Sequence, residues 1–135
     1  MSALRTVSRG LIAALFFSAG LDVLRRPEPR AEVAHHALTK LRSVVPAVPD
    51  DVTAVRANAA VQMVAATLFM LGKAPRAAAG VLAASLVPTT LAGHAFWRYD
   101  DPAQRAQQRA HFVKNLGILG GLVLAAIPSD EDRTR

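Results

Sequence analysis

The chain has 135 residues, of which 52% are hydrophobic and only 5% aromatic, and its mean hydropathy is +0.26. This is too apolar for an ordinary soluble domain of this size, so the composition predicts one small membrane domain over residues 1–135. The net charge is +6, but the basic residues are scattered between apolar segments, which argues against nucleic-acid binding. The absence of cysteine excludes disulfides, thiolate nucleophiles and Cys-bound metal.

The first apolar segment is predicted to span a membrane over about residues 6–24. Its basic start could be mistaken for a signal peptide, but three further spans follow, and a first transmembrane helix accounts for the same residues. Gly10, Ala14 and Ser18 recur every four positions and lead to Asp22. We expect this stripe of small residues to pack against another helix.

Residues 25–51 form a polar link in which prolines bracket a helix expected over residues 31–45. Apolar residues recur there at helical spacing beside basic residues, which predicts an amphipathic helix lying on the membrane surface. His35 and His36 point about 100° apart on a helix, so they are poorly placed to share one metal ion. A solvated or headgroup-facing role suits them better.

The second span is predicted over about residues 53–71 and the third over about 75–97. The short turn between them makes the two helices antiparallel neighbours. In the second span Asn58 and Gln62 share a face, whereas Arg56 points roughly 160° away from Asn58. We therefore expect only one of these two sets to face the other helices.

The third span contains Pro88, which cannot donate to the carbonyl four residues earlier. A kink is expected at this point, relieved by the hydroxyl of Thr89 or Thr90. Beyond the kink, Thr90, His94 and Trp97 lie on one helix face. Trp97 is most simply an anchor at the membrane interface.

The link after the third span is charged and rich in glutamine. Asp100 or Asp101 can cap a helix that has Pro102 at its first position. This helix is predicted to continue into a fourth span over about residues 108–127. On it His111, Lys114 and Asn115 share a face, at the depth where polar groups usually face protein or a cavity.

The first and third links of an antiparallel four-span bundle lie on the same membrane face, so the polar ends of all four spans should meet there. The predicted binding cluster consists of Asp22, Arg56, Asn58, Gln62, His94, His111, Lys114 and Asn115. Ionisable residues inside a membrane often mark a functional site. The alternative, of equal weight, is that these groups pair with one another to fix the bundle, for example Asp22 with Lys114 or Arg56.

Two stretches carry a resemblance to a known family. They read Leu-Val-Pro-Thr-Thr-Leu-Ala-Gly-His-Ala-Phe-Trp at 86–97 and Asp-Asp-Pro-Ala-Gln-Arg-Ala-Gln-Gln-Arg-Ala-His-Phe-Val-Lys-Asn-Leu-Gly-Ile-Leu-Gly-Gly at 100–121. Both closely resemble the DoxX family of small bacterial four-helix membrane proteins. Arg56, Asn58 and Gln62 are similar to that family's second span, and the resemblance covers about residues 5–126.

The resemblance implies an all-α integral membrane four-helix bundle, antiparallel and up-down, with the surface helix between the first two spans. It implies multi-pass insertion in a bacterial inner membrane. The family is linked to a membrane subunit of a thiosulfate:quinone oxidoreductase, and some members are thought to act beside soluble redox enzymes in oxidative or thiol stress. The count of basic residues leans slightly toward both termini lying outside.

Two functions remain open. The first is a component of a membrane redox system in which His94, His111 and Lys114 hydrogen-bond a quinone, while a bound cofactor or a partner supplies the electrons. The second is a non-catalytic scaffold that recruits a soluble oxidoreductase through the surface helix and the link at 98–109. Haem with His94 and His111 as axial ligands is a weaker hypothesis. No metal site is predicted, and catalysis, substrate and homo-oligomer formation are left open.

Overall fold

The computed structural model describes residues 3–128, and every regular element within that range is a helix. The elements are α1 (Ala3–Arg25), α2 (Glu28–Val44), α3 (Asp51–Met70), α4 (Pro75–Gly93), the short 3-10 helix η1 (Phe96–Arg98) and α5 (Pro102–Ala126). The all-α prediction is confirmed.

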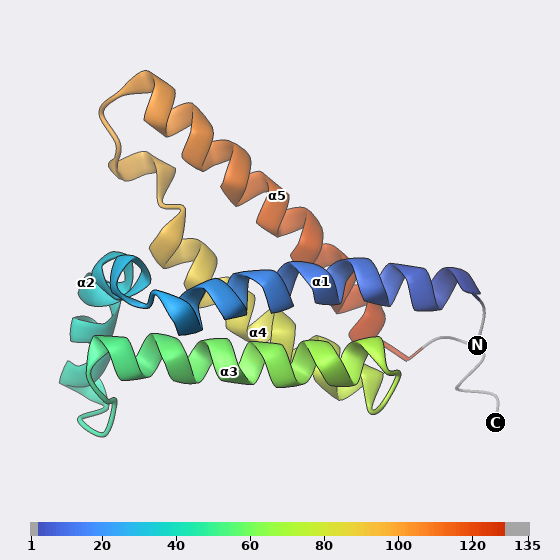
Figure 1. Ribbon diagram of the computed structural model, residues 1–135. Helices are drawn as coiled ribbons and strands as arrows, with labels where there is room; N and C mark the ends of the chain where they lie inside the picture. The colour runs from blue at the N-terminus through green and yellow to red at the C-terminus, as the bar shows by residue number, and fades with distance from the viewer. Residues whose placement is uncertain (1–2, 129–135) are drawn as a thin grey trace.

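The four long helices pack in sequence rather than as a closed square (Figure 1). α1 and α3 lie side by side and antiparallel, α4 packs against α3, and α5 packs against α4. α2 lies across the end of the α1–α3 pair, in contact with α3 and α4. The first half of α5 diverges from α1, and its second half returns to the core, where Leu122 is fully buried beside Phe16, Phe69 and Leu82.

Three helical stretches are long and apolar enough to cross a membrane: Ala3–Arg25, Asp51–Met70 and Pro75–Arg98. α3, with 20 residues, is about 30 Å long, which matches the apolar thickness of a bilayer. α5 is not among the three, because Arg109, His111, Lys114 and Asn115 interrupt its apolar run. Large apolar side chains face outward along these helices, including Leu11, Val64 and Leu124, as a lipid-facing surface requires.

The helix boundaries follow local signals. Asp101 caps α5 by accepting a hydrogen bond from the Gln104 backbone N–H at 2.8 Å, which confirms the predicted cap before Pro102. α4 continues through Pro88, and the Thr89 hydroxyl donates to the Ser85 carbonyl at 2.9 Å. The continuous helix from 102 also confirms that the link feeds the last apolar segment directly.

The prediction that the small-residue stripe of α1 forms its packing face is wrong. Ala14 and Ser18 are exposed, whereas Ala13, Phe16 and Gly20 are buried. Spacing of four residues identifies a face of a helix but not the neighbour it meets, and α3 contacts the adjacent face. Gly20 marks the close approach, because a Cβ there would lie 2.5 Å from Cγ of Met63.

Gly20→Ala should therefore destabilise the protein by about 1–3 kcal/mol, because Met63 and the nearby carbonyl of Ala59 would have to shift. Chemical unfolding in a mild detergent measures this change. Gly10→Ala is the matched control: nothing lies within 4 Å of a Cβ there, and removing a helical glycine should leave stability unchanged or raise it by about 0.5–1 kcal/mol. Equal losses in both variants would contradict the close contact at Gly20.

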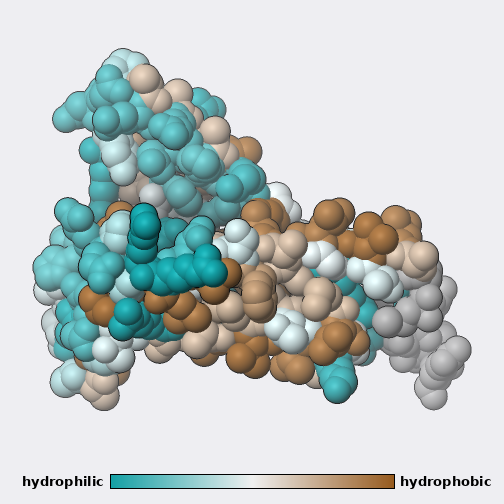
Figure 2. Space-filling model, viewed as in Figure 1, coloured by the Kyte–Doolittle hydropathy of each residue, from teal (hydrophilic) through white to brown (hydrophobic). Residues whose placement is uncertain are grey.

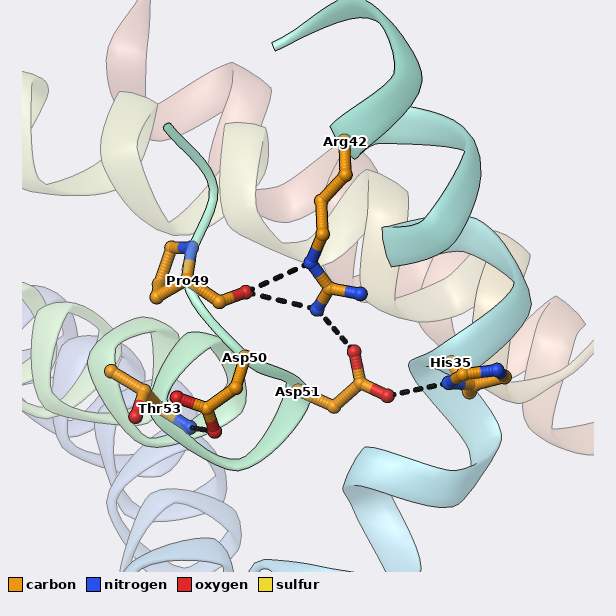
Figure 3. A network of polar contacts seen from close by, with 6 residues as sticks. All are labelled: His35, Arg42, Pro49, Asp50, Asp51 and Thr53. Carbon is orange, nitrogen blue, oxygen red and sulfur yellow. Dashed lines mark hydrogen bonds and ion pairs between the residues drawn. The ribbon is translucent and has the colours of Figure 1, made fainter. Parts of the chain in front are cut away.

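A polar clamp holds α2 to the start of α3 (Figure 3). Arg42 donates to the Pro49 carbonyl at 3.0 and 2.9 Å and pairs with one carboxylate oxygen of Asp51. The other oxygen of Asp51 lies 2.6 Å from Nδ1 of His35. Asp50 caps α3 through the Thr53 backbone N–H. The clamp closes the loop between the two helices and fixes the orientation of α2.

The clamp lowers the pKa of Asp51, first through the hydrogen bond from Arg42 and then through that from His35. Asp51 lies at the aqueous end of α3, before the apolar run that begins near residue 53. Because its pKa is lower in the folded state, its stabilising contribution is fully present above the ordinary carboxyl pKa of about 3.9. The contribution is lost as the pH falls through the lowered pKa.

Asp51→Asn should accordingly lower the Tm of the detergent-solubilised protein at pH 7, and the gap to wild type should close as the pH falls below about 4. Thermal scans at several pH values measure the difference. Asp100→Asn is the control, because Asp100 is an exposed acid just before another helix. A gap that persists at low pH would show that the carboxylate charge does not drive the effect.

Candidate functional site

The structure distributes the eight predicted residues over three places and the exposed surface. Asn58 and Gln62 lie between α3 and α4, His94, His111 and Asn115 lie between α4 and α5, Asp22 lines a cavity between α1 and α2, and Arg56 and Lys114 are exposed. The residues therefore do not form one cluster. The set between α4 and α5 is the candidate site.

A chain of hydrogen bonds joins α3 to α4. The Ser85 hydroxyl donates to Oδ1 of Asn58 at 2.8 Å and accepts from Nε2 of Gln62 at 2.7 Å. Gln62 is buried, and the bonds satisfy its amide donor and the Asn58 acceptor. Because Asn58 faces α4 while Arg56 is exposed, only one of the two predicted sets faces the other helices. These amides act as interhelical ties.

Polar contacts between α4 and α5 lie at two levels. In the deeper one, buried Asn115 donates through Nδ2 to the hydroxyl of buried Thr90 at 3.0 Å. Nearer the link, Nδ1 of His94 donates to Oε1 of Gln108 at 2.8 Å. The His94 ring stacks on the His111 ring, with centroids 5.1 Å apart and planes 24° apart. Among residues 3–128, the His111 ring makes no hydrogen bond, so its nitrogens are open to a ligand.

Aromatic rings brace this end of the site. Phe96 and Trp97 of η1 both meet Phe112 of α5 edge to face, with centroids 5.5 and 5.9 Å apart. Phe112 also lines a small apolar cavity of about 60 Å³ between α4 and α5, together with Leu91 and Leu116. The histidine pair is thus followed, toward the core, by an apolar groove.

Asp22, Arg56 and Lys114 stand apart from these contacts. Within the described range Asp22 forms no ion pair with Lys114 or Arg56, the two pairings considered for a purely structural cluster. Lys114 is exposed on α5, although its charge acts on nearby His94. It can approach a ligand only from the rim of the site.

The stacked histidines do not suit a haem between them. Axial ligands point their nitrogens at each other across the iron, whereas the rings of His94 and His111 lie face to face. No group of three or more His, Cys, Asp or Glu residues in the described part of the chain could hold a metal ion.

Sequence reasoning missed Ser85 and Gln108. Ser85 lies among alanines, where its hydroxyl is indistinguishable from a small packing residue, although it is three residues before Pro88 on the face toward Gln62. Gln108 is one of several glutamines in a charged link and follows His94 by 14 residues in the sequence. The helix that starts at Pro102 brings its side chain within hydrogen-bonding distance of the His94 ring. Arg105, an exposed residue of the charged link, donates to the Tyr99 carbonyl at 2.8 Å and holds the link.

No family model, curated protein or solved structure matches the chain.

Ser85→Ala should lower the free energy of unfolding by about 1 kcal/mol, because it leaves a donor of Gln62 and an acceptor of Asn58 unpaired between the helices. Chemical unfolding in detergent measures the loss. Ser18→Ala is the control, since this serine is exposed on α1 and should change stability little. If the two variants were equally stable, the hydrogen-bond chain would contribute nothing.

Proposed function

We propose that the protein is a DoxX-like, multi-pass protein of a bacterial inner membrane that binds a quinone headgroup between α4 and α5 as part of a membrane redox system. The observation that carries the proposal is the stacked pair of His94 and His111 at the end of the apolar groove between the two helices. In this proposal α1, α3, α4 and α5 cross the membrane in that order as an antiparallel up-down bundle, with α5 as the fourth span. Three helices with sufficient length and apolarity support the membrane location.

The chemistry of the residues fits a quinone. Its carbonyl oxygens accept hydrogen bonds, which a ring N–H of His111 can donate, and its isoprenoid tail is apolar, so a polar group beside an apolar cavity matches both parts. The cavity of about 60 Å³ is too small for a ring and can take only the first part of a tail. The ring would therefore lie outside this cavity, beside the histidines at the end of the α4–α5 contact.

The histidines can also handle protons. Nδ1 of His94 donates to Gln108, which leaves Nε2 as the acceptor in the neutral ring. Reduction of one quinone to the quinol takes two electrons and two protons. An imidazole ring can take up a proton at one nitrogen and release it again, so a histidine beside the quinone can pass protons. This chain has no cysteine, so a bound cofactor or a partner oxidoreductase, soluble or membrane-bound, would supply the electrons.

The test uses the single tryptophan of the chain as a reporter. Trp97 contacts Phe112, which lines the groove, so decylubiquinone bound there should quench its fluorescence in a saturable way. His111→Ala should weaken binding about tenfold through loss of one hydrogen bond. His36→Ala, an exposed histidine on α2, should leave it unchanged. Unsaturable quenching, or equal affinity in all three proteins, would overturn the quinone site.

One observation favours the scaffold as the second candidate. The first half of α5 projects away from the α1–α3 pair, and its surface is largely hydrophilic (Figures 1 and 2). Such a projection suits the capture of a soluble oxidoreductase. A protein that binds no quinone but retains such a partner at the membrane, and loses it when exposed Gln107 is replaced by alanine, would support the scaffold.

A further inference from the structure

A cavity of about 710 Å³ opens where α1 ends and α2 begins. Arg25, Arg26 and Arg30 line it together with Asp22, and Val23 is among the apolar residues of its wall. Buried Pro27 forms the turn between the two helices and starts α2. Because α1 is a candidate span and α2 crosses its end, the cavity would lie at the level of the membrane surface (Figure 1).

The cavity carries an excess of positive charge. Three arginines and one aspartate give its lining a formal charge of +2. Within residues 3–128, no carboxylate lies within 4.0 Å of these three guanidinium groups. An unpaired guanidinium presents a planar fork of donors that matches the oxygens of a phosphate. Three such groups in one cavity favour an anion with several oxygens.

The lining is also amphiphilic. Ala19 and Val23 of α1 and Val33 of α2 give it an apolar side. Figure 2 shows the most hydrophilic atoms directly beside hydrophobic ones at the end of the molecule where α2 lies. A volume of about 710 Å³ accommodates a headgroup with its glycerol and the first carbons of its chains. A small inorganic anion would leave most of this space and the apolar side unused.

We propose that this cavity binds the phosphate headgroup of an anionic phospholipid, with Arg25, Arg26 and Arg30 around the phosphate and the acyl chains leaving along α1. The inference rests on the proposed membrane location but not on quinone binding. The guanidinium of Arg30 lies close to the end of α4, because a Cβ built on Gly93 would be 3.3 Å from its Nη1. Arg30 is the arginine that α2 adds to the cavity, whereas Arg25 belongs to the end of α1.

The experiment titrates the detergent-solubilised full chain with dioctanoyl-phosphatidylglycerol, dioctanoyl-phosphatidylcholine and inorganic phosphate, with binding read by microscale thermophoresis. The phosphatidylglycerol should bind at least tenfold more tightly than the phosphatidylcholine, and 10 mM inorganic phosphate should not displace the phosphatidylglycerol. Arg25→Gln with Arg26→Gln should weaken binding at least tenfold. Arg56→Gln, an exposed arginine outside the cavity, should change it less than twofold.

Equal affinity for the two lipids, or an equal loss in Arg56→Gln, would overturn the site, because general surface charge would then explain binding. If inorganic phosphate displaced phosphatidylglycerol and bound with the same affinity, the occupant of the cavity would be a free anion and not a lipid. Thermal scans confirm that each variant folds. Saturable quenching of Trp97 by decylubiquinone in the double variant shows that the quinone site is intact, so the two proposals fail separately.

Discussion

The arrangement of the helices depends on the pairing of polar side chains inside an apolar layer. Three helices are long and apolar enough to cross a membrane. For such helices in lipid, burial of aliphatic groups would gain little, so close packing and satisfied hydrogen bonds would hold them together. Throughout the described residues, no buried side-chain nitrogen or oxygen lacks a partner. Ser85 ties α4 to α3 and Thr90 ties α4 to α5. α4 is thus the central helix, and these two hydroxyls, five residues apart, set the rotation of its neighbours.

The same constraint explains the divergence of α5. Beyond Asn115, toward its start, α5 meets α4 and η1 only through the His94–Gln108 bond, the stacked histidines and the rings around Phe112. Its residues there are mostly exposed and polar. The contact between α1 and α5 instead involves the second half of α5, where a Cβ on Gly121 would lie 3.9 Å from Cδ1 of Ile12. The first half of α5 is therefore polar and mostly exposed, whereas its second half packs in the apolar core.

The sequence allowed the helices and their caps to be predicted, because these depend on residues close together in the chain, such as Asp101 and Pro102. The sequence also predicted that Asn58 and Arg56 point in different directions, because this depends only on their spacing along one helix. It could not identify the packing face of α1, which depends on how Gly20 meets Met63 of a distant helix. Nor could the sequence show which polar residues lie together, because the rotation of each helix determines which side chains meet. Ser85 and Gln108 carried no local signal of their hydrogen bonds.

The two candidate sites meet at Arg30. Its guanidinium lies between the cavity at the end of α1 and the end of α4, next to His94. Because His94 directly follows Gly93, one arginine at a helix junction connects the proposed lipid cavity with the end of the helix that carries the proposed quinone site. A side chain at position 93 would press on this guanidinium, since a Cβ there would lie only 3.3 Å from Nη1 of Arg30. The absence of a side chain at Gly93 therefore leaves room for Arg30 at the edge of the cavity.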